Sequence, residues 1–205
     1  PAKMADDAIA YREAQSIKFK LTGDLDLDVA RANAIRAARP DVWLGVDANQ
    51  GFARRDLDRL VAAMVAANVS LIEQPLARGS EADLDGYDAP IPLAADESAL
   101  TLDDVAGLKG RFDVFNIKLD KCGGLTEALM IAAAARETGL DVMVGCMVCS
   151  SLGAAPAFVV GQVCDLVDLD GPTFLKEDRT PGVVYQDGTI WCDEAVWGAR
   201  AVVPA

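Results

Sequence analysis

The chain alternates short apolar runs with helix-patterned segments, and this alternation limits its possible folds more than any other feature. Between the runs, apolar residues recur at helical spacing, as in Leu57, Leu60 and Val61. Strands connected through helices pair in parallel, with the helices covering the sheet. We predict an α/β fold with strands at 16–21, 42–47, 71–73, 92–96, 114–119, 141–147 and 165–170, and helices at 3–14, 28–39, 54–67, 101–108, 125–138 and 151–161.

Two architectures fit this pattern. An open doubly wound sheet needs a glycine-rich phosphate loop after its first strand, whereas a barrel builds its site from loops after all of its strands. Polar residues follow nearly every predicted strand here, which favours a (β/α)-barrel. A barrel has eight strands and seven are found, so we expect that the first strand is missing before Pro1. Residues 1–172 would then be the catalytic barrel domain (strands 2 to 8), and 173–205 part of a separate lobe.

Charged residues recur at the ends of the predicted strands. The intervals along Lys20, Asp47, Glu73, Asp96 and Lys118 are 27, 26, 23 and 22 residues, about one strand-plus-helix unit each. A repeating βα chain gathers these side chains at one end of the barrel. Three carboxylates on adjacent strands suit a hard cation such as Mg²⁺, and without a cation they would repel one another. The alternative, that each acid only caps a helix, explains one such residue better than three.

Composition excludes several functions. The sequence has no histidine, which rules out Ser-His-Asp triads and the common zinc and iron sites that use this residue. A net charge of −13 argues against nucleic-acid binding. We expect no membrane segment and a cytoplasmic location, since no apolar stretch is long enough to span a bilayer and five scattered cysteines suit reduced thiols.

Lysines are the candidates for proton transfer. Lys18 and Lys20 are two residues apart on one predicted strand, so both side chains point to the same face. Lys118 lies on the sixth of the eight implied strands, across the barrel from the second. A partly desolvated lysine near other positive charge has a lowered pKa and can act as a base near neutral pH. Lys20 and Lys118 could therefore remove a proton from one face of a substrate carbon and return it to the other.

These motifs together resemble a known family. The segments K-x-K at 18–20, DAN at 47–49, EQP at 73–75, DES at 96–98 and NIKLDKCGG at 116–124 are similar to the enolase superfamily, muconate lactonizing enzyme subgroup. The resemblance, which extends from Lys18 to Pro172, implies a modified TIM barrel closed by an N-terminal capping domain that this chain lacks, with 173–205 as part of the capping lobe. It also implies Mg²⁺ bound by Asp47, Glu73 and Asp96, α-proton exchange by Lys20 and Lys118, and an enolate that Lys18 helps to stabilise.

The last predicted strand indicates a substrate. Asp168 and Asp170 are two apart and would face the barrel mouth together, which suits the ammonium group of a peptide. This D-x-D, and GCMVCSS at 145–151 with Cys146 near the substrate, resemble dipeptide epimerases of the L-Ala-D/L-Glu type, which are isomerases. Three enzymes remain as alternatives, namely o-succinylbenzoate synthase, N-succinylamino acid racemase and muconate cycloisomerase. An inactive truncated barrel or scaffold also remains open, and so does a homo-oligomer.

Overall fold

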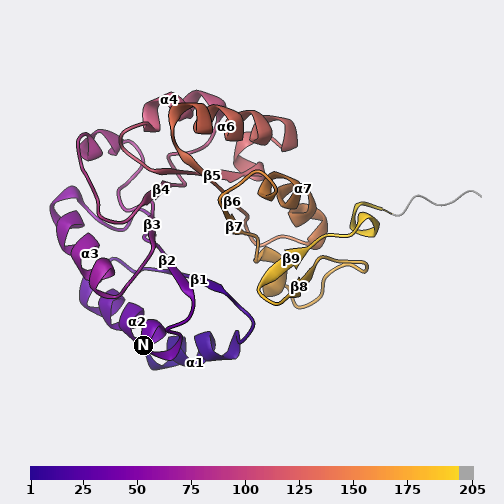
Figure 1. The fold of residues 1–205 in the computed structure, drawn as a ribbon, viewed down its shortest axis with the longest axis horizontal. Helices are drawn as coiled ribbons and strands as arrows, with labels where there is room; N and C mark the ends of the chain where they lie inside the picture. The colour runs from indigo at the N-terminus through magenta and orange to yellow at the C-terminus, as the bar shows by residue number, and fades with distance from the viewer. Residues whose placement is uncertain (199–205) are drawn as a thin grey trace, which may run out of the picture.

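Seven parallel strands form one curled sheet in the computed structural model, which describes residues 1–198 (Figure 1). The strands follow one another in chain order, so β1 and β7 are the two edges of this sheet. They are β1 (Ser16–Lys20), β2 (Trp43–Asp47), β3 (Leu71–Glu73), β4 (Leu93–Ala95), β5 (Val114–Lys118), β6 (Asp141–Gly145) and β7 (Leu166–Asp168). The prediction of a parallel barrel with one strand fewer than eight is confirmed.

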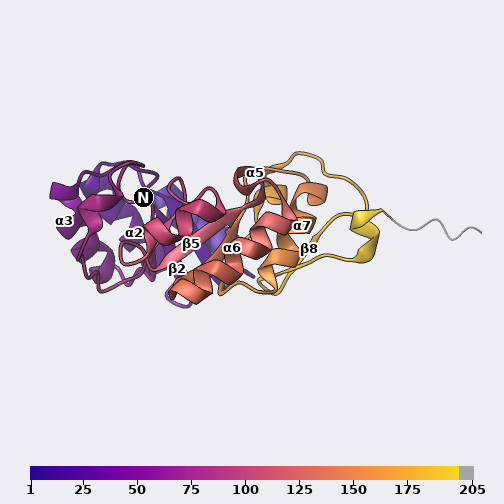
Figure 2. The same cartoon turned by 90° about the horizontal axis from the view of Figure 1, so that it is seen from above.

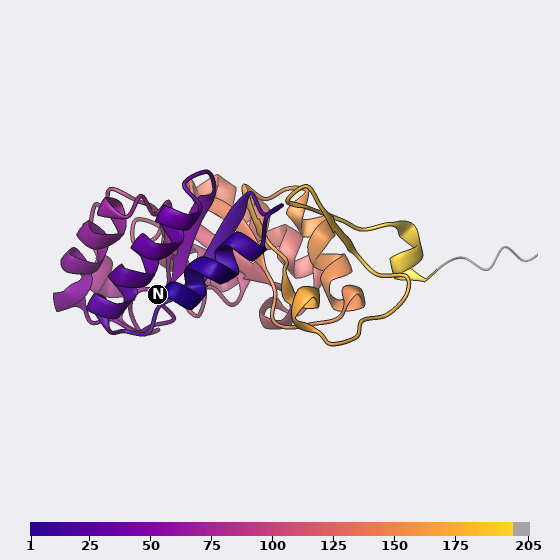
Figure 3. The same ribbon diagram turned by 90° about the horizontal axis from the view of Figure 1, so that it is seen from below.

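Helices cover the outer face of the sheet, as Figure 2 shows for α2, α3, α6 and α7. α1 packs along α2 near the β1 edge (Figure 3). The α-helices are α1 (Ala2–Ala10), α2 (Leu25–Ala38), α3 (Arg54–Ala66), α4 (Val105–Leu108), α5 (Leu119–Cys122), α6 (Leu125–Thr138) and α7 (Ser151–Gly161), and the 3₁₀ turns are η1 (Glu81–Leu84), η2 (Leu102–Asp104), η3 (Gly171–Phe174) and η4 (Glu194–Trp197). Among the described residues, none of these helices is long and apolar enough to cross a membrane.

Two apolar clusters hold the sheet. The larger lies between the sheet and its helices. The smaller lies on the inner face and takes one side chain from each of six strands: Trp43, Leu71, Ala94, Val114, Met143 and Leu166. A Cβ atom at Gly45 would lie 2.7 Å from the Trp43 ring, so the glycine makes room for this indole. Because side chains alternate along a strand, residues two and four positions later on each strand face the same interior.

Several predicted boundaries need correction. β6 ends at Gly145 instead of residue 147. β7 ends at Asp168 instead of residue 170, because only two residues separate it from the turn η3, which begins at Gly171 and Pro172. The first helix ends at Ala10, four residues before the predicted end. The predicted helix 101–108 is a 3₁₀ turn followed by α4, and Thr101 is the N-cap of this turn. Gly139 ends α6 in the left-handed conformation, directly after the predicted end of this helix at residue 138.

The chain after β7 leaves the βα repeat, as predicted. β8 (Val184–Gln186) and β9 (Thr189–Trp191) form an antiparallel hairpin across Asp187 and Gly188, which both have positive φ, as a two-residue turn of type I′ requires. The Tyr185 hydroxyl donates a 2.5 Å hydrogen bond to the carbonyl of Leu169. The segment is thereby tied to the loop that follows β7. Its assignment to a capping lobe stays a prediction, and residues 199–205 lie outside the described residues.

Candidate active site

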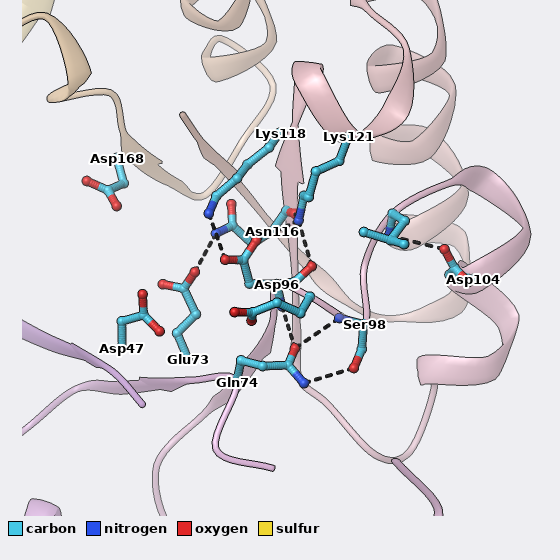
Figure 4. A network of polar contacts seen from close by, with 12 residues as sticks. Asp47, Glu73, Gln74, Asp96, Ser98, Asp104, Asn116, Lys118, Lys121 and Asp168 are labelled. Carbon is cyan, nitrogen blue, oxygen red and sulfur yellow. Dashed lines mark hydrogen bonds and ion pairs between the residues drawn. The ribbon is translucent and has the colours of Figure 1, made fainter. Parts of the chain in front are cut away.

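Five of the predicted site residues lie close together at the carboxyl ends of their strands in Figure 4: Asp47, Glu73, Asp96, Lys118 and Asp168. Lys20 is the register partner of Asp47, and Asp47 is the register partner of Glu73, so these three residues lie at one level of the sheet. Lys118 pairs with Gly145, and Gly145 pairs with Asp168. The parallel register therefore gathers side chains that lie far apart in the sequence, as the spacing predicted.

The three carboxylates of the predicted metal site are buried. Asp47 is 2%, Glu73 0% and Asp96 4% exposed. Each accepts a hydrogen bond from a different lysine, at 2.9 Å from Lys20 to Asp47, 2.5 Å from Lys18 to Glu73 and 2.6 Å from Lys118 to Asp96. Buried carboxylates are stable only when they are paired, and the lysines serve that purpose in this arrangement.

Electrostatics shows that the carboxylates act on one another. Burial raises the pKa of Glu73, Lys18 opposes this, and the nearby charges of Asp47 and Asp96 raise it further. Burial also raises the pKa of Asp96, but Lys121 and Lys118 outweigh it, so this pKa is lowered. A cation placed among the three would relieve the repulsion at Glu73.

The donor set fits a hard divalent cation in chemistry, since it consists of carboxylate oxygens. Within residues 1–198, however, no three acidic, cysteine or histidine side chains form a preformed metal cluster, because each carboxylate is turned toward its lysine. One further acceptor in the site is free: Oδ1 of the fully buried Asn116 has no hydrogen-bond partner, while its Nδ2 donates to Glu73 at 2.8 Å. The metal-ligand role of the three acids stays a prediction.

The lysines differ from the sequence-based expectation. Burial lowers the pKa of Lys18, but Glu73 and Asp168 outweigh it and raise the value well above normal. Lys118 behaves likewise, because Asp96 and Glu73 outweigh burial and the repulsion from Lys18. The prediction that neighbouring positive charge would lower the pKa of a proton-transfer lysine is wrong for Lys118 in this arrangement. The reason is that a carboxylate lies within hydrogen-bond distance of its ammonium.

The substrate-binding candidates lie beside this cluster. The Lys18 ammonium bridges Glu73 and Asp168, at 2.5 and 2.6 Å. Asp170 lies beyond the end of β7 and is exposed, yet surrounding atoms and the charge of Asp168 raise its pKa. Leu169 between them is buried. Because β7 ends at Asp168, strand alternation does not extend to Asp170, and its place on the same side as Asp168 stays a prediction. Burial raises the pKa of the Cys146 thiol to about 12, so this thiol is neutral at pH 7. The substrate contacts of these residues stay predictions.

The sequence interpretation missed three residues that shape the site. Asn116 binds Glu73, as described above. Lys121 donates to Asp96 from α5, which lies outside the strands, and burial lowers its pKa more than Asp96 raises it. The Gln74 side chain connects the loops after β3 and β4, because its Oε1 accepts from the backbone N–H groups of Asp96 and Ser98. All three lie inside the motifs quoted above, at 73–75 and 116–124, so these motifs could have identified them as site residues.

The fold and the site together define a parallel α/β barrel with acids and lysines at the carboxyl ends of its strands. Residues 2–195 match the family model described as Enolase C-terminal domain-like, and the chain belongs to this family. It is 43% identical over 199 residues to the N-acetyl-D-glutamate racemase of Pseudoalteromonas sp, covering 97% of this chain and 62% of that protein. It is 38% identical over 190 residues to the L-Ala-D/L-Glu epimerase of Escherichia coli (strain K12), covering 93% and 59%.

Solved structures agree with this family. An enolase family member from Agrobacterium tumefaciens with homology to dipeptide epimerases, described with bound sodium and L-Ala-L-Glu, has a TM-score of 0.85 and 40% identity, covering 96% of this chain and 59% of that one. The dipeptide epimerase of Methylococcus capsulatus, complexed with a Mg ion, has a TM-score of 0.87 and 32% identity, covering 93% and 59%. The chain thus spans about three fifths of the length of the relatives it matches.

Proposed function

We propose that the protein containing this chain is a Mg²⁺-dependent isomerase that inverts the α-carbon of an amino acid carrying an acyl group on its nitrogen, with dipeptides of the L-Ala-D/L-Glu type as substrates. One observation carries the proposal. A row of three buried carboxylates has Lys20 paired with Asp47 at one end and Lys118 paired with Asp96 at the other. An inversion needs one base for each face of the carbon, and this arrangement offers two.

The chemistry follows from the acidity of the α-carbon. Removing its proton places negative charge on the adjacent carboxylate, and enolase-superfamily sites are known to stabilise such an enolate with a metal ion while a lysine or histidine acts as the base. Asp47, Glu73 and Asp96 would hold the Mg²⁺ ion, which supplies positive charge near the developing enolate. Lys20 and Lys118 would each take or return the proton on its own side. The Mg ion described for the Methylococcus capsulatus relative supports this assignment.

Asp168 supports a substrate with an ammonium group. The Lys18 ammonium lies 2.6 Å from its carboxylate, so this carboxylate already pairs with an amine inside the curl of the sheet. The amino terminus of a dipeptide has the same chemistry. Asp170 would add a second acidic group on the same side. The L-Ala-L-Glu described for the Agrobacterium tumefaciens relative is such a dipeptide.

A second candidate is racemisation of N-acetylglutamate, and two observations favour it. The relative with 43% identity is an N-acetyl-D-glutamate racemase. In addition, Lys18 already neutralises Asp168 from within the protein, so a substrate without an ammonium group leaves no unpaired charge there. N-acetylglutamate and L-Ala-Glu are both glutamates acylated on nitrogen. The alanyl group carries an ammonium group and one further carbon that the acetyl group lacks. The relatives described above do not support o-succinylbenzoate synthase or muconate cycloisomerase.

The test is deuterium uptake at the glutamate α-carbon. The full-length protein with Mg²⁺ is incubated in D₂O with each isomer of L-Ala-Glu and of N-acetylglutamate, and exchange is followed by proton NMR. We expect exchange and inversion of both L-Ala-Glu isomers, faster than for N-acetylglutamate. The reverse order would favour the second candidate. A protein that exchanges none of the four would contradict both candidates, and one that exchanges no dipeptide at all would be an inactive barrel or a scaffold.

The acidic pair is tested separately. Replacing Asp168 and Asp170 by Asn removes the charge that would attract an ammonium group, so KM for L-Ala-L-Glu should rise at least tenfold, while KM for N-acetyl-L-glutamate changes less than threefold. An equal rise for both compounds would contradict the assignment. The control is Asp103→Asn, which removes an exposed carboxylate on η2.

We also propose a cytoplasmic location, which the free state of all five cysteines supports. Fractionation of cells that express the tagged full-length protein tests it. Assembly into a homo-oligomer stays a hypothesis for the full-length protein, and its mass in solution, measured by light scattering, would decide.

A further inference from the structure

The carboxylate of Asp96 is shared by two lysines that approach it on different oxygens. Lys118 donates to Oδ2 at 2.6 Å, and Lys121 donates to Oδ1 at 2.6 Å. In Figure 4, Lys118 lies on the side of Asp96 that faces Glu73, and Lys121 lies on the other side. Both lysine side chains are largely buried, at 12% and 16% exposed. The two lysines are therefore similar in burial, and any difference between them comes from their contacts.

The hydrogen bonds of the two ammonium groups differ. Lys121 donates to Asp96 Oδ1, to the Asp96 carbonyl at 2.6 Å and to the Asn116 carbonyl at 3.2 Å. An ammonium has three donors, so these three acceptors account for all of them. Within the described residues, Lys118 has one hydrogen bond, to Asp96. Releasing Lys118 breaks a single contact, whereas releasing Lys121 would also leave two backbone carbonyls without this donor.

Lys121 also connects the strand ends that carry the site. The Asp96 carbonyl follows β4, and the Asn116 carbonyl lies within β5. Asn116 itself holds Glu73 through its side chain, at 2.8 Å. The contacts of one ammonium thus reach two of the three buried carboxylates, one directly and one through the strand that carries Asn116. These contacts fix the place of Asp96 relative to Glu73.

We infer that Lys121 is a positioning residue that holds Asp96 by Oδ1, so that Oδ2 stays available to the cation and Lys118 stays free to move a proton. The inference rests on the proposed function for the roles of the cation and of Lys118. Two lysines that are three residues apart would thus have different roles. Lys121 stays in place through its backbone contacts, and Lys118 exchanges partners.

The inference predicts a loss of metal affinity. Lys121→Met keeps a side chain of similar length but removes all three donors, and Lys121→Arg keeps the charge with a different donor geometry. Groups that orient metal ligands typically change metal affinity or activity by about 10–100-fold when they are mutated. In the full-length protein, we expect Lys121→Met to raise the Mg²⁺ dissociation constant at least tenfold by calorimetric titration, with a similar fall in kcat and less than a threefold change in KM. Lys121→Arg should restore part of both losses.

The control is Lys109→Met, which removes an exposed lysine elsewhere and should leave both quantities unchanged. A folded Lys121→Met protein whose Mg²⁺ affinity and kcat lie within twofold of wild type would overturn the inference. If Lys121→Met does not fold, Lys121→Gln, which retains an amide donor, is measured against the same limits.

The two proposals fail separately. If the wild-type protein exchanges no α-proton but Lys121→Met still weakens Mg²⁺ binding tenfold, the proposed function is wrong and the positioning role stands for metal binding. If exchange is normal in wild type, and both exchange and Mg²⁺ affinity are unchanged in Lys121→Met, the positioning role is wrong and the proposed function stands. A wild-type protein that binds no Mg²⁺ would overturn both.

Discussion

Two lysines that the proposed mechanism treats as a pair have different surroundings. The Lys20 side chain is 70% exposed, whereas that of Lys118 is 12% exposed. Each ammonium donates to one buried carboxylate, so each must break only this hydrogen bond to reach a substrate in the site. Lys20 is the more exposed of the two because its strand, β1, is an edge of the described sheet.

Each lysine should serve one stereoisomer. Replacing Lys20 by Ala should abolish α-proton exchange from one isomer of L-Ala-Glu, with at least a hundredfold loss, while some exchange from the other isomer persists. Lys118→Ala should show the opposite preference, because it removes the base on the other face. Initial rates in D₂O by NMR, before inversion accumulates, check this. Equal residual rates for both isomers in either variant would contradict a two-base mechanism.

At the residue scale, the sequence predicted which residues gather but not how they pair. The interval of about one βα unit located Lys20, Asp47, Glu73, Asp96 and Lys118, because parallel register repeats the same geometry at every strand. Lys121 escaped this reasoning, since it belongs to α5 and follows no strand directly. The contact of Lys18 with Asp168 depends on the curvature that brings β1 toward β7, which no local pattern encodes.

The loops after β3 and β4 are held together by the side chain of Gln74. Gln74 adopts a positive φ of 37° directly after Glu73, and its buried amide is fully used. Oε1 accepts from the backbone of Asp96 and Ser98, and Nε2 donates to the Leu76 carbonyl and to Ser98 Oγ. This one side chain joins the ends of β3 and β4, which carry two of the predicted metal ligands.

Removing this amide should cost stability. Gln74→Leu would leave the N–H groups of Asp96 and Ser98 buried without partners, at about 1–3 kcal/mol for each unpaired group. We expect the free energy of unfolding in urea to fall by about 2 kcal/mol or more. The control is Gln162→Leu at the C-cap of α7, since Gln162 is exposed and its side chain, within the described residues, donates only to the Phe158 carbonyl. An equal effect of both substitutions would show that the Gln74 hydrogen bonds contribute little.

Asp165 links three elements near β7, and it should make stability depend on pH. It accepts hydrogen bonds from the N–H of Val142 and from Arg136, both at 2.9 Å, and these contacts lower its pKa, with the Val142 bond as the main cause. A lowered native pKa means that the contribution is complete above the usual value of about 3.9 and is lost as the pH falls through the native value.

Asp165→Asn should therefore destabilise the protein at pH 6, and its deficit relative to wild type should shrink as the pH falls below about 4. Urea unfolding of both proteins at pH 6, 4 and 3 measures the difference. The control Asp103→Asn removes an exposed carboxylate on η2. A deficit of Asp165→Asn that stays constant with pH would refute the assigned cause.

At the level of elements, regular periodicity predicted the bounds of a helix correctly, whereas the end of a strand before a turn was predicted incorrectly. The helix over 151–161 was predicted at its observed bounds, because small and apolar residues continue without interruption until the chain turns. The last strand was predicted too long. Alternation suggested a strand through Asp170, but Gly171 and Pro172 start a 3₁₀ turn whose preceding residue, Asp170, has a helical backbone (φ −85°, ψ −3°).

For the whole molecule, the curl of the sheet converts a linear row of strand ends into a site. Lys18 on one edge strand contacts Asp168 on the other, so a charge pair connects β1 and β7 across the mouth of the curl. The same lysine contacts Glu73 in the middle of the row. The carboxylates of Asp168 and Glu73 are thus both within hydrogen-bond distance of the Lys18 ammonium. Backbone pairing links each strand to the next from β1 to β7, and the contact of Lys18 with Asp168 joins the two edge strands.

The buried acids should make the stability of the full-length protein depend on Mg²⁺. Three carboxylates that repel one another are stabilised by a bound cation, and binding to the folded state alone adds about 2.7 kcal/mol at a Mg²⁺ concentration of 100 times Kd. For a domain of about 200 residues this corresponds to a rise in Tm of roughly 5–10 °C. Thermal unfolding followed by circular dichroism, with Mg²⁺ or with EDTA, measures the shift.

The matched variant is Asp47→Asn, which removes one of the three charges but keeps the size of a side chain that is 2% exposed. It should lose most of the Mg²⁺-dependent rise, because a neutral amide is a weaker ligand for a hard cation than a carboxylate. Asp103→Asn should keep the full rise. If Asp47→Asn gains as much from Mg²⁺ as wild type does, the ion binds elsewhere, and the row of acids would then serve only to pair the lysines.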